Sequence, residues 1–207
     1  MGDGIRWLAD REWIPGVLFA RGIGPQELAV RMGGDRDGAT RPITDGEAWG
    51  LGEWYRPGED GDGVVRVGED QGWSFALEYG DSTGSDLRDE ISRGGVEVVH
   101  YLPMPDHPPA LVFYARDGVT LCGFGLGEEN VRWGQEPGLL LPDLIAGQVL
   151  QPDGSTRTAP EDEHSAAAGR RALGIIEQRF GLSLPTACLE DARLPAYAVR
   201  GEPDMDI

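Results

Sequence analysis

The chain has 207 residues, of which 40% are apolar and 26% are charged, ordinary proportions for a globular protein. Its 36 acidic residues outnumber 18 basic residues, all of them arginine, so the formal net charge is −18. A strongly negative surface repels phosphate, which argues against nucleic acid or an anionic membrane as partner and favours a basic protein.

The sequence contains no apolar run of about 18 residues, and its first residues lack the charged, apolar and small-residue order of a signal peptide. We therefore expect a soluble, cytoplasmic protein. The two cysteines, Cys122 and Cys188, are too few for a disulfide framework, so we expect buried free thiols. No pattern indicates a cofactor.

The N-terminal third begins with apolar residues that we expect to pack on the body as a short helical or irregular segment, namely Trp7, Leu8, Trp13 and Ile14. Residues 17–20 then predict a strand of the central sheet. Residues 24–33 predict a helix, because Pro25 suits its first turn and Gly33 its end. Leu28 and Met32 should form its buried stripe.

Residues 34–63 form a long connection rich in Gly, Asp, Arg, Thr and Pro, with one expected helical part near Asp45 to Trp49. A connection this long is uncommon inside a compact domain. It is either a surface segment that packs on the core through its aromatic residues, or a binding loop.

Five strands are predicted from alternating apolar residues, at 64–68, 73–79, 96–101, 110–116 and 119–125. The dipeptide Asp117-Gly118 between the last two strands predicts a hairpin, and polar residues 68–72 predict another turn. Residues Trp73, Phe75, Leu77 and Tyr79 should share one face. We expect Trp73, Phe75 and Phe113 to belong to the core.

Residues 85–94 predict a short helix between the second and third of these strands, with Ser85 as N-cap and Gly94 at the end. Leu87 and Ile91 are four residues apart and should face the sheet. A helix between antiparallel strands indicates an α+β fold. We predict an antiparallel sheet of five to six strands with helices mainly on one face.

The C-terminal third predicts two helices, at 138–150 and from Thr158 to Phe180, followed by a packed segment and a frayed tail at 201–207. The long helix should bury Leu173, Ile176 and Phe180. Residues 1–200 are thus expected to form a single domain. The glycines at 123, 125 and 127 are better explained by a strand end than by a phosphate loop, because no helix follows them directly.

Six segments carry a resemblance to a known family: Gly24-Pro25-Gln26-Glu27-Leu28, Val65-Arg66-Val67-Gly68, Gly72-Trp73-Ser74-Phe75-Ala76-Leu77-Glu78, the helix 87–94 with Val96-Glu97-Val98-Val99, Phe113-Tyr114-Ala115-Arg116-Asp117-Gly118, and Arg132-Trp133-Gly134. Over residues 13–180 the chain resembles uncharacterised actinobacterial proteins that share a domain of unknown function. The resemblance implies fold boundaries, and it implies no activity or catalytic residues.

Candidate catalytic residues are few, because the chain has three histidines without a metal-binding spacing and no serine or cysteine nucleophile motif. His100 lies at a strand end, and His107 follows Asp106 in a proline-rich connection. Asp106 could assist His107 as a general base. A solvated loop histidine is the alternative interpretation.

Two functional hypotheses of different classes follow. The first is an acidic protein-binding module, most concretely an immunity-type protein that neutralises a basic toxin. Its expected anchors are Trp49, Trp54 and Tyr55, with a rim of acidic residues at Glu53, Glu59 and Asp60. The alternative is an enzyme or small-molecule-binding protein with a pocket near residues 49–55 and His100 or His107 as acid or base.

Overall fold

The computed structural model describes residues 3–11, 14–52, 62–80, 83–157 and 165–200. Within them the strands are β1 (Gly16–Arg21), β2 (Asp62–Asp70), β3 (Trp73–Gly80), β4 (Glu97–Leu102), β5 (Leu111–Arg116), β6 (Val119–Gly125), β7 (Arg132–Trp133) and β8 (Ala196–Arg200). The α-helices are α1 (Pro25–Arg31), α2 (Asp45–Gly52), α3 (Thr83–Ile91), α4 (Leu141–Ala146) and α5 (Ser165–Phe180). Two 3-10 helices are η1 (Arg6–Asp10) and η2 (Thr186–Leu189).

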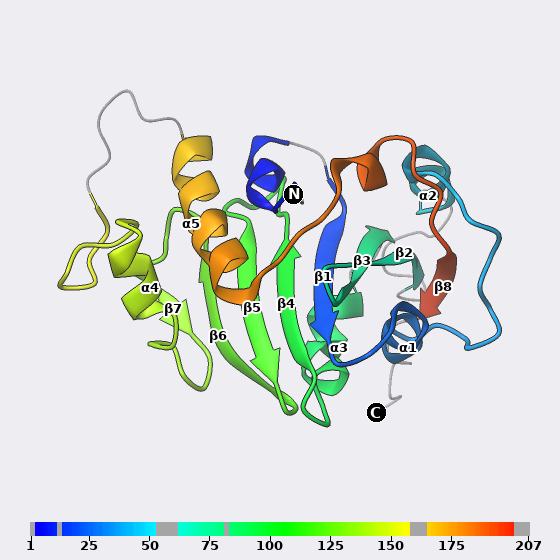
Figure 1. The fold of residues 1–207 in the computed structure, drawn as a ribbon, viewed down its shortest axis with the longest axis horizontal. Helices are drawn as coiled ribbons and strands as arrows, with labels where there is room; N and C mark the ends of the chain where they lie inside the picture. The colour runs from blue at the N-terminus through cyan, green and yellow to red at the C-terminus, as the bar shows by residue number, and fades with distance from the viewer. Residues whose placement is uncertain (1–2, 12–13, 53–61, 81–82, 158–164, 201–207) are drawn as a thin grey trace.

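The strands form one open sheet in the order β7-β6-β5-β4-β1-β3-β2-β8, in which every neighbouring pair is antiparallel (Figure 1). The predicted α+β class and antiparallel pairing are confirmed. The predicted number of five to six strands is wrong, because the sheet has eight. The additional strands β7 and β8 lie at the two edges, where a strand pairs on one side only and its sequence signal is weak.

Two-residue turns join the β2–β3 and β5–β6 hairpins. Asp117 and Gly118 have φ values of 54° and 85°, and Gln71 and Gly72 have values of 48° and 79°. Two successive positive φ angles define the type I′ turn, whose twist suits a hairpin. The hairpin predicted at Asp117-Gly118 is therefore confirmed. The other turn is shorter than residues 68–72, because β2 continues to Asp70, which pairs with Trp73.

One face of the sheet carries the larger core, which includes Trp73, Phe75, Leu77 and Tyr79 of β3 as predicted. Helix α5 packs on this face beside η1 (Figure 1). It contributes the three residues expected from its sequence, Leu173, Ile176 and Phe180.

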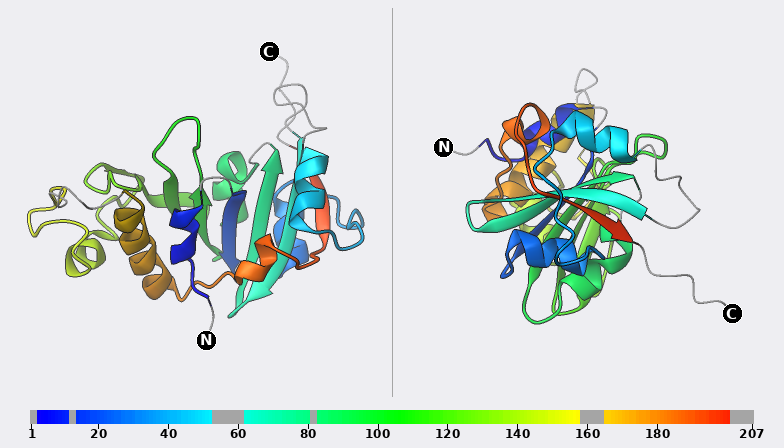
Figure 2. Two further views of the ribbon diagram at one scale, coloured as in Figure 1. Left: turned by 90° about the horizontal axis from the view of Figure 1, so that it is seen from above. Right: turned by 90° about the vertical axis from the view of Figure 1, so that its right-hand side faces the viewer.

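The opposite face carries a second core, in which α1 packs on β2 and β3 and α3 packs on β4, β5 and β6. Figure 2 shows helices on both sides of the twisted sheet. The prediction of helices mainly on one face is therefore wrong. The prediction fails because of the pattern in β3, where the small or polar residues Ser74, Ala76 and Glu78 alternate with apolar ones and so predict a solvent-exposed face. All three are buried, with exposures of 2%, 0% and 4%.

Several element boundaries differ from those predicted. Helix α3 begins at Thr83 rather than after Ser85, and α4 is shorter than residues 138–150. Helix α2 occupies the middle of the connection 34–63. The expected frayed tail at 201–207 lies outside the described residues. Within the described parts of the chain, no helix has the length and apolar character needed to cross a bilayer.

Candidate functional site

Helix α2 begins with a capping box that holds its first turn. The Thr44 amide donates to Glu47 Oε2 at 2.8 Å, and the Glu47 amide donates to Thr44 Oγ1 at 3.3 Å. The hydrogen bond from the Thr44 backbone, with Arg193 beside it, lowers the pKa of Glu47 below its ordinary value. The Thr44-x-x-Glu47 spacing was visible in the sequence, and it would have located the start of this helix.

Besides Glu47, the outward side of α2 carries large apolar side chains that reach the solvent. The helix buries Ala48, whereas the side chains of Trp49 and Leu51 are 37% and 41% exposed. They are two of the four exposed large hydrophobic residues in the described chain. Trp49 packs edge-on against Tyr79, with ring centroids 5.3 Å apart and an interplanar angle of 88°. Trp49 is therefore held in place while part of its ring faces solvent.

Arg66 of β2 lies beneath α2 and is fully buried. Its Nη1 donates to the Tyr79 hydroxyl at 2.8 Å and to Asp45 Oδ1 at 3.3 Å, and the Tyr79 hydroxyl donates to the same Asp45 oxygen at 2.5 Å. Burial raises the pKa of Tyr79, so this phenol stays protonated. Arg66 also donates to the carbonyls of Ile43, Cys188 and Ala192.

These contacts join four segments that are distant in sequence. The buried guanidinium ties the residues before α2, the first turn of α2 and the η2 region to the sheet. A buried cation with carbonyl and carboxylate partners on all sides is satisfied, and its role here is to position α2.

The other residues predicted to anchor or surround a partner lie outside the described residues. They are Glu53, Trp54, Tyr55, Glu59 and Asp60, which directly follow α2 in the chain. Of the predicted anchors, Trp49 is therefore the one that lies within the described residues, and it is exposed on the surface.

His100 lies in a buried polar cluster between the sheet and α3. Its side chain is 0% exposed, and its Nε2 lies 2.8 Å from Glu78 Oε2. Its Nδ1 lies 3.5 Å from Nη1 of Arg88, a guanidinium donor. Because a guanidinium can only donate, this geometry makes Nδ1 the acceptor from Arg88 and Nε2 the donor to Glu78. Burial lowers the pKa of Arg88, whose guanidinium stacks on the Phe113 ring with Cζ 3.8 Å from the centroid.

Two glycines make room for the Glu78 carboxylate. A Cβ at Gly16 would lie 2.7 Å from Glu78 Oε2, and a Cβ at Gly84 would lie 2.6 Å from Oε1. The Gly84 amide, in the first turn of α3, donates to Oε1 at 2.8 Å. The cluster therefore attaches the start of α3 to the sheet. Its geometry favours a structural role for His100 over an acid or base role.

Asp106 and His107 are exposed in the loop between β4 and β5. The His107 amide donates to the Met104 carbonyl at 3.1 Å, which shapes the turn. No hydrogen bond or ion pair of the described residues joins either side chain to His100. The structure thus leaves the three candidate catalytic residues in two different environments, one buried and one solvated.

Cys122 and Cys188 are both buried and free. Burial raises the pKa of both thiols, which makes them poor nucleophiles at neutral pH. Among the described residues, no group of three or more His, Cys, Asp or Glu side chains is placed to hold a metal ion.

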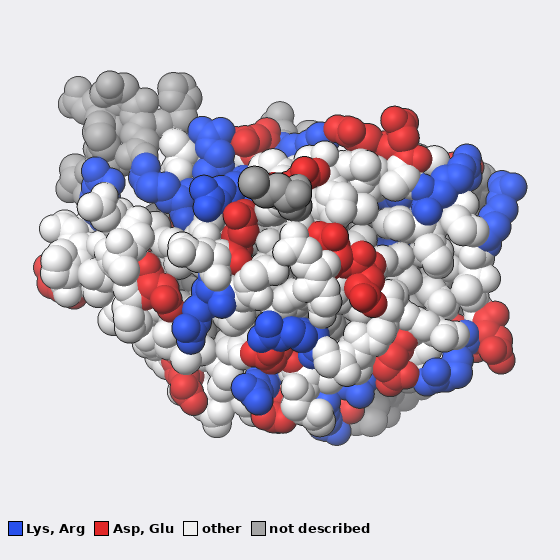
Figure 3. Space-filling model, viewed as in Figure 1, with Lys and Arg blue, Asp and Glu red and all other residues white. Residues whose placement is uncertain are grey.

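The charge of the molecule is unevenly distributed. Figure 3 shows both signs on one face, with arginines gathered over α5 and η1. Arg6, Arg170 and Arg171 line a cavity of about 390 Å³ beside α5. The segments outside the described residues contain eleven of the 36 acidic residues and only one of the 18 arginines. The negative charge is thus concentrated in those segments more than on the sheet and helices.

Taken together, these features define an α+β protein built on an open antiparallel sheet, with a capped helix that presents apolar side chains. A family of unknown function, DUF6461, matches residues 16–203, and the chain belongs to this family. The match confirms the resemblance to an uncharacterised family and extends it beyond residue 180. No curated protein and no solved structure matches the chain.

Proposed function

We propose that this protein is an acidic protein-binding module that binds a basic protein through the outward face of α2. The observation that carries the proposal is the placement of Trp49 and Leu51, which α2 leaves exposed while it buries Ala48. In its most concrete form, the module is an immunity-type protein that neutralises a basic toxin.

The construction of this surface supports the proposal. Tryptophan is enriched among the residues that contribute most to binding energy, particularly where it is already held by packing. Trp49 is held by Tyr79, and the capping box and Arg66 hold the helix. A rigid surface loses little conformational entropy when a partner binds, so more of the contact energy appears as affinity.

Charge supports the same class of partner. The acidic residues Glu53, Glu59 and Asp60 follow α2 directly in the sequence and would form the rim of such an interface. With a formal net charge of −18, the protein attracts basic proteins over long range and accelerates their encounter.

The alternative hypothesis, a pocket near residues 49–55 that uses His100 or His107, has less support. Such a pocket requires a histidine that can reach a ligand. His100 is fully buried and hydrogen-bonded on both ring nitrogens.

The test is to isolate and identify the basic protein that binds the tagged chain in its host, and to measure its affinity for single variants. Trp49→Ala should weaken binding about 30-fold, as expected for a central anchor. Trp133→Ala is the matched control, because Trp133 is equally exposed, at 38%, but lies on the edge strand β7. Raising the salt concentration should slow association because it screens the long-range attraction.

Two results would contradict the proposal. One is a bound protein whose affinity is the same for the wild type and Trp49→Ala. The other is an association rate that does not change with salt. If the identified partner is a toxin, its activity should be lost on addition of the wild type and restored with Trp49→Ala.

A further inference from the structure

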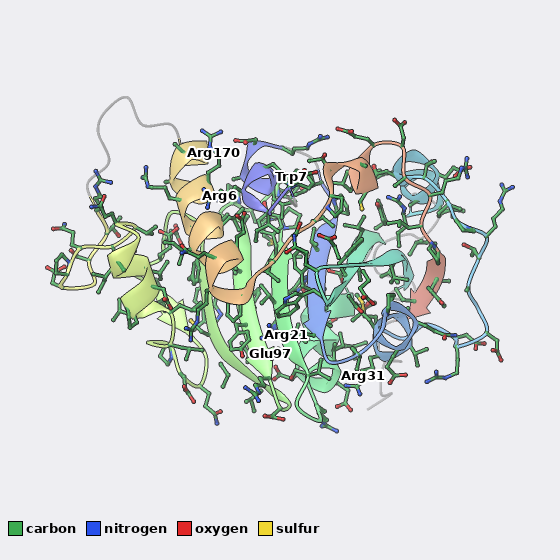
Figure 4. All side chains as sticks on the ribbon, viewed as in Figure 1. Arg6, Trp7, Arg21, Arg31, Glu97 and Arg170 are labelled. Carbon is green, nitrogen blue, oxygen red and sulfur yellow. The ribbon has the colours of Figure 1, made fainter. Side chains whose placement is uncertain are left out.

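A cavity of about 510 Å³ lies where η1, the end of β4, the β4–β5 loop, the end of β6 and α5 meet. Figure 4 shows η1 beside α5 at this side of the molecule, with Arg6, Trp7 and Arg170 labelled. Most of the cavity lining is apolar, and these residues include Ala9, Pro108, Pro109, Ala110 and Leu126. Its volume suits a small organic molecule.

Glycines allow the walls of this cavity to come together. A Cβ at Gly125 would lie 2.5 Å from Pro109 Cγ, and a Cβ at Gly169 of α5 would lie 3.3 Å from the Ala9 Cβ. The Leu126 amide donates to the Ala110 carbonyl at 2.8 Å and holds the β6 end against the start of β5. The cavity is thus bounded by packed, hydrogen-bonded backbone.

Tyr101 supplies a polar group to this apolar lining. The residue is 5% exposed and lines the cavity, and its hydroxyl is not one of the fully buried side-chain atoms without a partner among the described residues, so it keeps some access to the cavity space. By contrast, the buried Tyr79 and Tyr114 hydroxyls donate to Asp45 and Glu97. Burial raises the pKa of Tyr101 to about 12, so the phenol is protonated at neutral pH and can both donate and accept. A hydroxyl that reaches the space of the cavity is available to donate to, or accept from, a bound ligand.

The charge of the lining selects the sign of the ligand. Glu128 is the charged residue in the lining, and its side chain is exposed at the edge of the cavity. The next residue, Glu129, is 3% exposed, and its Oε1 accepts from the Gly127 amide at 2.7 Å. Glu128 lines the cavity and Glu129 does not, so Glu128 is the carboxylate that acts at the cavity itself.

We infer that this cavity is a binding site for a small organic amine with a ring-sized apolar body. The ammonium group donates to the Tyr101 hydroxyl oxygen and is neutralised by Glu128, while the apolar body lies against Pro108, Pro109 and Leu126. The site goes beyond the proposed function, since it uses β4, β6 and α5, whereas the proposed protein interface uses α2.

The experiment titrates the full-length protein with 2-phenylethylamine and follows binding by NMR and calorimetry. Phenylacetate and 2-phenylethanol serve as anionic and neutral probes with the same ring. We expect the amine to bind at least about tenfold more tightly than either comparison probe, because Glu128 attracts only the cation. Amide shifts should change at Ala110 and Leu126.

Two pairs of variants test the assigned contacts. Tyr101→Phe removes only the hydroxyl, and Tyr114→Phe is its control, because the Tyr114 hydroxyl already bonds to Glu97. Glu128→Gln removes the charge, and the exposed Glu136→Gln is its control. Each site variant should weaken binding of the amine about fivefold, and each control should leave it unchanged.

The inference is overturned if the amine causes no shift changes at about 10 mM, which would correspond to negligible affinity. It is also overturned if 2-phenylethanol or phenylacetate binds as tightly as the amine, or if Tyr101→Phe and Tyr114→Phe bind it equally. The melting temperature of each variant should be measured as well, to show that weaker binding is not caused by unfolding.

Discussion

At the scale of single residues, buried charges decide how the parts of this molecule are held together. Arg66 takes its partners from residues 43, 45, 79, 188 and 192, so one guanidinium connects the start of α2, β3 and the C-terminal segment. His100 and Glu78 do the same for α3 on the other face. These polar groups replace apolar packing at the points where separate segments meet.

We predict that Arg66→Met destabilises the protein by about 3–5 kcal/mol, because it leaves Asp45 and several buried carbonyls without their donor. Arg193→Met is the control. The Arg193 side chain is 54% exposed and pairs with Glu47, so its loss should cost less than about 1 kcal/mol. Urea denaturation measures both, and equal midpoints for the two variants would refute the structural role of Arg66.

The core aromatic Phe75 provides a second prediction. It is 2% exposed, and its ring lies 2.5 Å from where a Cβ at Gly68 would stand. Phe75→Ala should destabilise the protein by about 3–5 kcal/mol, since it opens a cavity in the larger core. Val131→Ala, at a residue that is 57% exposed, should change stability by less than about 0.5 kcal/mol. An unchanged melting temperature for Phe75→Ala would show that Phe75 is not packed in the larger core.

Glu97 gives a prediction for pH. Burial raises the pKa of this carboxyl, but hydrogen bonds from Arg21 and from the Tyr114 hydroxyl outweigh that effect and lower the pKa below its ordinary value. Figure 4 shows Arg21 and Glu97 side by side. A carboxyl with a lowered folded-state pKa stabilises the protein above its unfolded pKa, near 4.5, and loses that contribution as pH falls through the folded value.

Glu97→Gln should therefore be less stable than the wild type at pH 7, and the difference should shrink as pH falls below about 4.5. Urea midpoints measured across this range provide the test. Tyr114→Phe should show the same trend with smaller amplitude, because Arg21 remains. A difference that is constant with pH would contradict the assignment.

At the scale of elements, α2 combines a strong start with a weak interior. The capping box fixes its first turn, while Gly46 and Gly50 lower its helix propensity. A Cβ at either glycine would have no heavy atom within 4 Å. The helix is therefore kept in place by its cap, by the burial of Ala48 and by Arg66, and the intrinsic helix propensity of its residues contributes little.

We predict that Gly46→Ala and Gly50→Ala each stabilise the protein by up to about 1 kcal/mol. Gly84→Ala in α3 is the contrasting change. Its Cβ would lie 2.6 Å from Glu78 Oε1 and 2.8 Å from Leu18 Cδ1, so it should destabilise. Thermal melting of the three variants is sufficient. A loss of stability at position 46 or 50 would mean that those sites are not open.

At the scale of the whole molecule, the sheet separates two cores, and each core contains residues that only a complete fold can protect. Cys122 and Cys188 lie in the larger core, with exposures of 1% and 5%. Their protection therefore reports on the integrity of that side of the sheet.

We predict that both thiols react with an aromatic disulfide reagent only after unfolding, because burial blocks access and raises the pKa of each thiol. The thiol count should be two in denaturant and near zero in the native protein. Elemental analysis of the same sample should show no stoichiometric zinc. Rapid reaction of one thiol in the native state would contradict its burial.

The larger part of the fold could be predicted from the sequence. The sequence by itself determined the central strands, the hairpin at Asp117-Gly118 and the buried stripes of α1 and α5, because period and turn chemistry act between near neighbours in the chain. Of the candidate site residues, it identified Trp49 as an exposed aromatic.

Only the tertiary structure decided which polar residues are buried, that both faces of the sheet are covered, and that β7 and β8 complete its edges. It also decided that Glu78 and His100 form a pair and that Tyr101 lines a cavity. These features depend on partners that are far apart in the sequence, such as Arg66 and Ala192, which are 126 residues apart. No local pattern encodes such a partner, because burial and hydrogen bonding are set by which segments the whole fold brings together.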